Sequence, residues 1–160
     1  MRPPIKEDNR VPPPETLPAN IHAERTILGA ILLDNAAHTY AAETLQADDF
    51  SLDSHRRIFL RMTELMNEKR AVDIVTLAER LAFHGERQSI GGVAYLASLT
   101  EGLPRRPSIK DYICIVKEKR NLRVIIDQCQ EAISKAEAQT TMAPDIVKSL
   151  GIGLKGIKKS

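Results

Sequence analysis

The chain has 160 residues and a net charge of +2, with 42% hydrophobic and 28% charged residues, as in an ordinary globular protein. This length allows one domain with its own core, and the small net charge argues against binding nucleic acid through overall charge. No apolar run approaches the ~20 residues of a membrane span, and the start lacks a hydrophobic signal core. Cys114 and Cys129 fall too far apart in one expected helix to bridge within it, so we expect reduced thiols and a cytoplasmic location.

Residues 1–19 differ from the rest of the chain because they hold six of its nine prolines and few large apolar side chains. Such a composition favours an extended or disordered leader. Proline-rich ligands of SH3-type domains have a similar composition, so a ligand segment is the alternative interpretation.

Helical periodicity begins at Asn20, whose side chain can cap the segment that follows. Gly29 interrupts this helix at a cost of about 1 kcal/mol relative to alanine, so we expect another helix to approach closely there. The apolar positions recur at helical spacing and predict one buried face: Ile27, Leu28, Ile31 and Leu32.

Two further helices are expected before residue 70. The first is alanine-rich and spans residues 35–45, with Tyr40, Ala41 and Leu45 turned inward. The second begins at Asp53 or a nearby serine. Its stripe is rich in methionine, which occurs in cores and in promiscuous binding grooves, but the stripe is narrow and interrupted by charge, which favours core packing. It comprises Ile58, Phe59, Met62, Leu65 and Met66.

Asp73 and Thr76 have the spacing of an N-terminal cap and the third helical position, which predicts a fourth helix. Gly85 fits the left-handed residue that follows the last turn of such a helix. Gly91 and Gly92 let the backbone turn tightly into a fifth helix. The inward positions of that helix are expected to be Val93, Leu96 and Leu99.

The longest expected element runs from Ser108 to about Ala138, a stretch without Pro or Gly. As a continuous helix it would be roughly 46 Å long, more than a small head domain needs. We expect its first half to pack on the head and its second half to project. A projecting apolar stripe is an exposed patch that needs a partner. The candidate partner interface on it comprises Leu122, Ile125, Ile126, Cys129 and Ile133.

The segment after residue 138 offers a second arm for a helical hairpin. Gly151, Gly153 and Gly156 weaken this arm, so residues 139–160 are expected to form a partial second arm or a flexible tail. The apolar residues that would fold back on the long helix are Ile146, Val147, Leu150 and Leu154. The predicted class is therefore all-α, with about seven helices: a compact multi-helix head plus a long helix that forms one arm of a helical hairpin.

The stretch GIGLKGIKKS almost matches a phosphate-binding loop, because Gly151 and Gly156 have the required spacing. However, Ile157 and Lys158 occupy the lysine and hydroxyl positions, and the preceding residues predict a helix rather than a strand. No C-x-x-C, G-x-S-x-G or helical His pair is present, so we expect no catalytic, metal or cofactor site. The remaining candidates are weak phosphate contacts: Arg105, Arg106, Lys117, Lys119 and Arg120.

Several stretches, taken in order, resemble one family: AERTILGAILLD, DDF, HRRIF, VDIVTLAERL, IGGVAYLASL and YICIVKEKRNLR. Over about residues 18–138 the chain looks like the N-terminal domain of the bacterial replicative DNA helicase of the DnaB type. The resemblance implies a helical head plus a hairpin, in which hairpins pair the heads into a collar that binds primase on a hexameric ring. The expected limits are a leader over 1–19, the family domain over 20–138 with its long helix over 108–138, and the segment 139–160.

The resemblance implies a non-catalytic assembly and docking domain, because these 160 residues hold no Walker motif or ATPase domain. ATP and Mg²⁺ are expected only in the missing ATPase domain of a full-length relative. The expected partners are a second copy, primase and the helicase ATPase domain, with nucleic acid bound weakly or indirectly and no membrane. Two alternatives remain: a stand-alone adaptor or inhibitor that binds helicase or primase, and a helical nucleic-acid-binding module.

Overall fold

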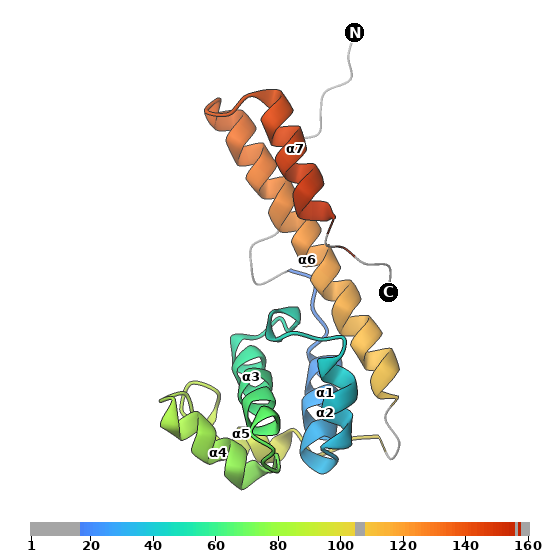
Figure 1. The fold of residues 1–160 in the computed structure, drawn as a ribbon, viewed down its shortest axis with the longest axis vertical. Coiled ribbons are helices and arrows are strands. Elements are labelled where there is room, and N and C mark those ends of the chain that lie inside the picture. Colours follow the sequence, from blue (N-terminus) through green and yellow to red (C-terminus); the bar gives the residue numbers. More distant parts are fainter. Residues whose placement is uncertain (1–16, 105–107, 156, 158–160) are drawn as a thin grey trace. The chain divides into compact units, whose positions relative to one another are not determined.

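A computed structural model describes residues 17–104, 108–155 and 157 of the chain, and within them it contains helices and no strand. The all-α class predicted from the sequence is thereby confirmed. The elements are α1 (Ile21–Leu33), α2 (Ala36–Ala42), the short 3₁₀ helix η2 (Ala47–Asp49), α3 (Asp53–Asn67), α4 (Ile74–Phe83), α5 (Gly92–Ser98), α6 (Ile109–Ala138) and α7 (Ala143–Leu154), as labelled in Figure 1.

The chain divides into two units within α6, between Arg120 and Asn121. We call Ala19–Arg120 the head, and we call the part from Asn121 onward, with α7, the hairpin. Leu17 and Pro18 group with the hairpin. Helix α6 passes through the division without interruption. The limits expected from the sequence, 1–19, 20–138 and 139–160, stay predictions. They follow a family resemblance, whereas the two units are defined by contacts within the structure.

Helix α1 forms the centre of the head because nearly its whole circumference is buried. It begins where the Asn20 side chain accepts a hydrogen bond from the backbone N–H of Ala23 at 2.9 Å. A methyl group on Gly29 would overlap the carbonyl oxygen of Leu99, the residue that ends α5. The close approach predicted at Gly29 is therefore confirmed, and its partner is backbone.

Two expected inward side chains point outward instead. Tyr40 is 42% exposed, because the short helix α2 turns His38 and Ala41 toward the core. His38 stacks on Phe59 with ring centroids 5.7 Å apart, and burial lowers the pKa of His38. Val93 is 46% exposed, because it lies in the first turn of α5, before the helix reaches the core at Leu96.

Helix α4 begins with the cap expected from its sequence. The Asp73 carboxylate accepts hydrogen bonds from the backbone N–H groups of Val75 and Thr76, each at 2.8 Å. The Thr76 hydroxyl accepts one in return from the Asp73 N–H at 3.0 Å, which completes a capping box. Gly85 follows the helix with a φ of 69°, in the left-handed region that favours glycine.

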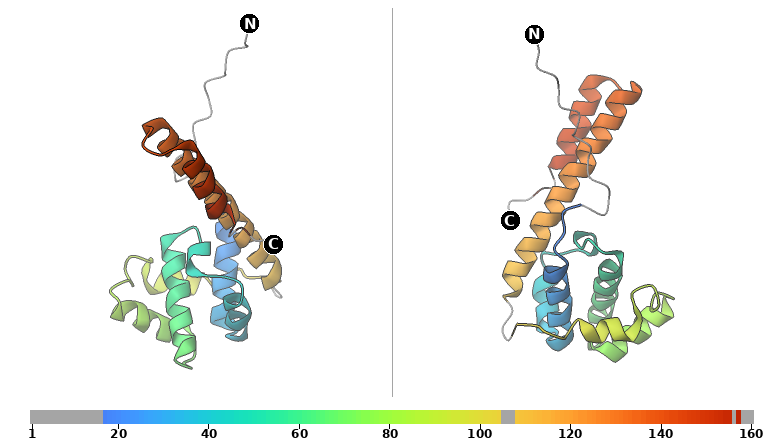
Figure 2. Two further views of the ribbon diagram at one scale, coloured as in Figure 1. Left: turned by 45° about the horizontal axis from the view of Figure 1, so that its top comes forward. Right: turned by 180° about the vertical axis from the view of Figure 1, so that it is seen from behind.

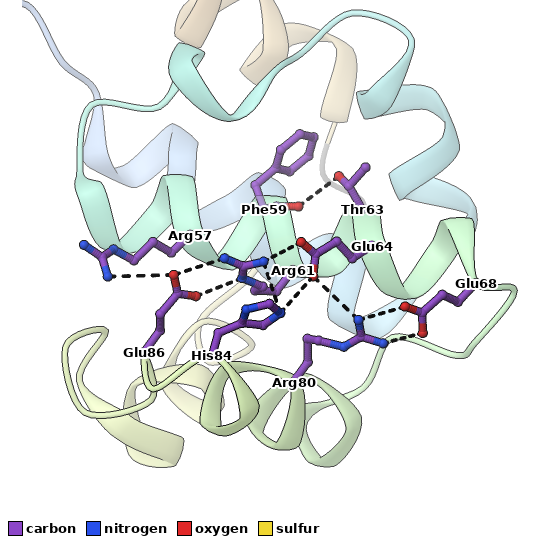
Figure 3. Close-up of polar contacts among 9 residues, drawn as sticks. All are labelled: Arg57, Phe59, Arg61, Thr63, Glu64, Glu68, Arg80, His84 and Glu86. Atoms are coloured by element: carbon purple, nitrogen blue, oxygen red, sulfur yellow. Dashed lines mark hydrogen bonds and ion pairs between the residues drawn. The ribbon is translucent and has the colours of Figure 1, made fainter.

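Charged side chains fasten α4 and the residues after it to α3 (Figure 3). The Arg61 guanidinium donates to the Glu86 carboxylate at 2.8 Å, and Arg80 donates to Glu68, also at 2.8 Å. The hydrogen bond between Arg61 and Glu86 raises the pKa of Arg61 and lowers the pKa of Glu86. The two ion pairs therefore hold α4 and the residues after it against α3 in addition to the apolar core.

Helices α6 and α7 run antiparallel beside each other (Figures 1 and 2). Gln139, with a φ of 53°, ends α6 in a left-handed conformation, and Pro144 lies in the first turn of α7, where its missing N–H is harmless. Helix α7 contains Gly151 and Gly153 and continues to Leu154. Neither of these two glycines interrupts the helix, and whether residues 139–160 act as a partial second arm or as a tail stays a prediction.

Candidate interface on the helical hairpin

The side chains of α6 that face α7 are short or polar. Gln128, Glu131, Ala132 and Lys135 of α6 line a shallow hollow together with Ile146, Ser149 and Leu150 of α7. Near the other end of the contact, the Gln128 side chain lies against Gly153. Helix α7 therefore packs its apolar residues against a side of α6 that the apolar stripe does not include.

The predicted partner stripe lies roughly 120° around α6 from this side, at about 100° of rotation per residue. It comprises Leu122, Ile125, Ile126, Cys129 and Ile133. Leu122 and Ile126 are half-buried, Ile125 is 39% exposed, Ile133 is 50% exposed and Cys129 is exposed. None of the five lines the hollow against α7, and Ile125, Cys129 and Ile133 are exposed, so these three retain the apolar surface for which a partner was expected.

Helix α7 extends the uncovered surface. Val147 is 71% exposed, and the antiparallel packing places it on the same side of the hairpin as Ile125, Cys129 and Ile133. We call these four residues the apolar face. The opposite side of the hairpin carries exposed polar residues, namely Asp127, Ser134, Asp145 and Lys148, with Ile152 as an apolar exception. The hairpin is therefore two-sided, as expected of a helix pair that packs through one side.

The candidate phosphate contacts lie in the head and in a part of the chain that is not described. Arg105 and Arg106 lie outside the described residues. The Lys117 ammonium lies 2.7 Å from the Asp49 carboxylate, so its charge is already balanced within the head. Lys119 and Arg120 are half-buried on the same helix. A role for these bases in binding phosphate stays a prediction.

A buried polar chain in the head was missed by the sequence reasoning. His55, 0% exposed, bonds through Nδ1 to Glu24 Oε2 and through Nε2 to the Tyr95 hydroxyl, both at 2.6 Å. The backbone N–H of Ser51 donates to the other Glu24 oxygen at 2.7 Å. Burial alone would raise the pKa of Glu24, but the bonds from His55 and Ser51 outweigh it and lower that pKa. The sequence did contain one sign of this chain: Glu24 lies among the apolar positions of α1, where a carboxylate needs a buried partner.

The chain joins α1, α3 and α5, and its central pair is almost inaccessible to solvent, with Glu24 1% and His55 0% exposed, so its geometry suits a structural rather than a catalytic role. Within the described residues, no cluster of three His, Cys, Asp or Glu side chains could hold a metal ion. The helices of the same residues also include none with the length and hydropathy needed to cross a membrane.

Comparison with known structures supports the same architecture. The crystal structure of the N-terminal domain of DnaB helicase from Mycobacterium tuberculosis superposes with a TM-score of 0.80 at 26% identity, covering 86% of this chain and 97% of that one. A second structure is described as a DnaB-like replicative helicase and its interactions with primase. It matches with a TM-score of 0.73 at 22% identity, covering 88% of this chain and 32% of that one, and so shows likeness of fold alone.

Comparison of sequences identifies the family. The replicative DNA helicase DnaB of Buchnera aphidicola subsp. Baizongia pistaciae is 39% identical over 119 residues, and that of Geobacillus stearothermophilus is 38% identical over 109 residues. These matches cover 74% and 68% of this chain but only 26% and 24% of the relatives, so the chain spans about a quarter of their length. Residues 16–118 match the family described as the DnaB-like helicase N terminal domain. The chain, with its helical head and the start of its long helix inside that match, therefore belongs to the family of DnaB-like helicase N-terminal domains.

Proposed function

We propose that this chain is a non-catalytic assembly and docking domain of a replicative DNA helicase. Its hairpin pairs with the hairpin of a second copy through the apolar face, and the paired domains offer a surface to primase. ATP, Mg²⁺ and DNA unwinding belong, on this proposal, to an ATPase domain of the kind that full-length relatives have room for.

The observation that carries the pairing is the uncovered apolar face. Ile133 and Val147, 50% and 71% exposed, come from different helices and lie on one side of the hairpin. Two hairpins that meet through these sides would form a four-helix bundle, the usual way in which antiparallel helix pairs bury apolar stripes. The polar opposite side, with Asp127 and Ser134, would stay in contact with water.

Support for primase as a partner comes from the similar structure whose description names interactions with primase. Because that structure is only 22% identical, it supports the fold of a docking domain and leaves the contact residues open. The test for this part is titration of the chain with purified primase in a calorimeter. If a chain that pairs normally gives no heat of binding with primase, this part of the proposal is contradicted.

Pairing is tested by two neighbouring substitutions that add the same charge. Ile133→Glu places a carboxylate on the apolar face and should weaken self-association tenfold or more, because an unpaired buried charge destabilises by well over 1.4 kcal/mol. Ser134→Glu adds the charge to the polar side and should leave self-association unchanged. Sedimentation equilibrium over a range of concentrations measures both.

A chain that stays monomeric at high concentration would contradict the pairing, as would equal effects of the two substitutions. A monomer that nevertheless binds a full-length helicase would favour the stand-alone adaptor or inhibitor instead. Both outcomes are read from the same sedimentation experiment once a full-length DnaB relative is added to one cell.

A further inference from the structure

Among the described residues of the head, the most exposed large apolar side chains lie on α4. Phe83 is 84% exposed and Val75 is 72% exposed, whereas Leu77 and Leu81 of the same helix are buried. Val75, Glu79 and Phe83 follow one another at intervals of four residues, so they lie along one side of α4. Phe83 therefore projects as an uncovered aromatic side chain from the last turn of this helix.

The free charge beside Phe83 is negative. Glu79 is exposed and forms no ion pair with another described residue. The neighbouring Arg80 guanidinium is already engaged, because it donates to Glu68 at 2.8 Å. A partner for this side of α4 must therefore accept an aromatic ring and offer a positive charge about one helical turn away from it.

Four exposed residues on α7 of the hairpin enclose an open position. Lys148, Gly151, Ile152 and Lys155 have the spacing i, i+3, i+4 and i+7, which surrounds the hole that a side chain of a facing helix enters in knobs-into-holes packing. Lys155 keeps helical dihedral angles, so the spacing holds to its end. A methyl group on Gly151 would meet no atom within 4 Å. We call these four residues the α7 hole.

Phe83 and the α7 hole are complementary in shape and charge. Gly151 leaves room for the ring, and Ile152, 59% exposed, and the lysine methylene groups give it apolar walls. A lysine ammonium within about 6 Å of the face of the ring would also attract it. Because a lysine lies about one turn to either side of the centre of the hole, Glu79 would meet one of them whichever way the two helices run.

We propose that Phe83 on the head of one copy inserts into the α7 hole of another copy, with Glu79 paired to one of its lysines. The two contacting surfaces differ, so the contact is heterologous: each copy gives its Phe83 to one neighbour and receives that of another. The contact does not use the apolar face. Its capacity to join pairs into a larger assembly rests on the pairing proposed above, so the contact is tested in a chain that cannot pair.

The Ile133→Glu chain provides this background, because its apolar face carries a charge. In sedimentation equilibrium this chain should still associate as its concentration rises, and adding Phe83→Ala should weaken that association about tenfold. Leu33→Ala is the matched control, because Leu33 is 66% exposed on the head but belongs to α1. A monomer at every concentration, or equal effects of the two substitutions, would overturn the contact whether or not the wild-type chain pairs.

Mixing two variants tests whether the contact joins different copies. Gly151→Leu fills the α7 hole and should leave the fold intact, because the position faces open space and leucine favours the helix over glycine. This variant keeps Phe83, whereas the Phe83→Ala variant keeps the hole. In the Ile133→Glu background each variant alone should be monomeric where the parent associates, and an equimolar mixture should form a one-to-one complex and nothing larger. A mixture that stays monomeric, or a Gly151→Leu variant that associates as its parent does, would overturn the proposal.

Discussion

The head and the hairpin are stabilised in different ways. Every buried apolar side chain among the described residues belongs to the head, and all of them except Ala30 form one connected core. In the hairpin, α7 has no buried residue. Apolar burial contributes about 25 cal/mol per Å², so the head gains most of its stability from its own packing, and the hairpin retains apolar surface for a partner.

One glycine in each region shows this difference most directly. A methyl group on Gly29 would overlap the carbonyl oxygen of Leu99, a backbone atom at the C-terminal end of α5. A methyl group on Gly153 would overlap only the end of the Gln128 side chain, which has other rotamers. The same substitution should therefore have opposite effects in the two regions.

Gly29→Ala should have the largest effect. The methyl group forces α1 away from the end of α5 in a close-packed core, which should destabilise the chain by about 3 kcal/mol. Urea unfolding followed by circular dichroism measures the loss. An unfolding midpoint equal to that of the wild-type chain would show that α1 and α5 are not in such close contact.

Much of the head was predictable because its signals are local. The Asn20 and Asp73 caps, the left-handed Gly85 and the close approach at Gly29 each depend on a few neighbouring residues, and all four are confirmed. The inward positions of short helices were less predictable. A seven-residue helix such as α2 has too few turns for its period to fix which side faces the core, which is why Tyr40 was misplaced.

Glu24→Gln should have the next largest effect. The amide keeps the size of the side chain but removes the negative charge beside fully buried His55, so we expect a loss of about 2 kcal/mol. Glu24→Asp is a useful second variant because it keeps the charge and shortens the reach. Chemical unfolding at neutral pH compares both with the wild-type chain.

The same pair predicts a dependence on pH. Burial alone would raise the pKa of Glu24, but the hydrogen bonds from His55 and Ser51 together outweigh it, so the pKa is lowered in the folded state. The stabilisation is then complete above the ordinary glutamate pKa and is lost as pH falls through the folded value. The stability difference between wild type and Glu24→Gln should narrow below about pH 4. A constant difference down to pH 3 would mean that Glu24 is not the titrating group.

Long-range choices in both regions could not be predicted from periodicity. The stripe with Cys129 and Ile133 predicted a partner for α6, but periodicity cannot tell whether that partner is α7 or another chain. In the structure α7 takes the side with Gln128 and Ala132 instead. The buried Glu24–His55 bond joins residues 31 positions apart, and no local pattern connects them.

Gly153→Ala should have the smallest effect, and of opposite sign to that of Gly29→Ala. Alanine favours the helix over glycine by up to about 1 kcal/mol, and moving the Gln128 side chain takes back part of this gain. We therefore expect about 0.5 kcal/mol of stabilisation, seen as slower amide hydrogen exchange in α7. Gly151→Ala is the matched control, because a methyl group there meets open space and the full gain should appear. Faster exchange in Gly153→Ala than in wild type would mean that α7 packs on α6 as rigidly as α1 packs on α5, and that the hairpin does not differ from the head in this respect.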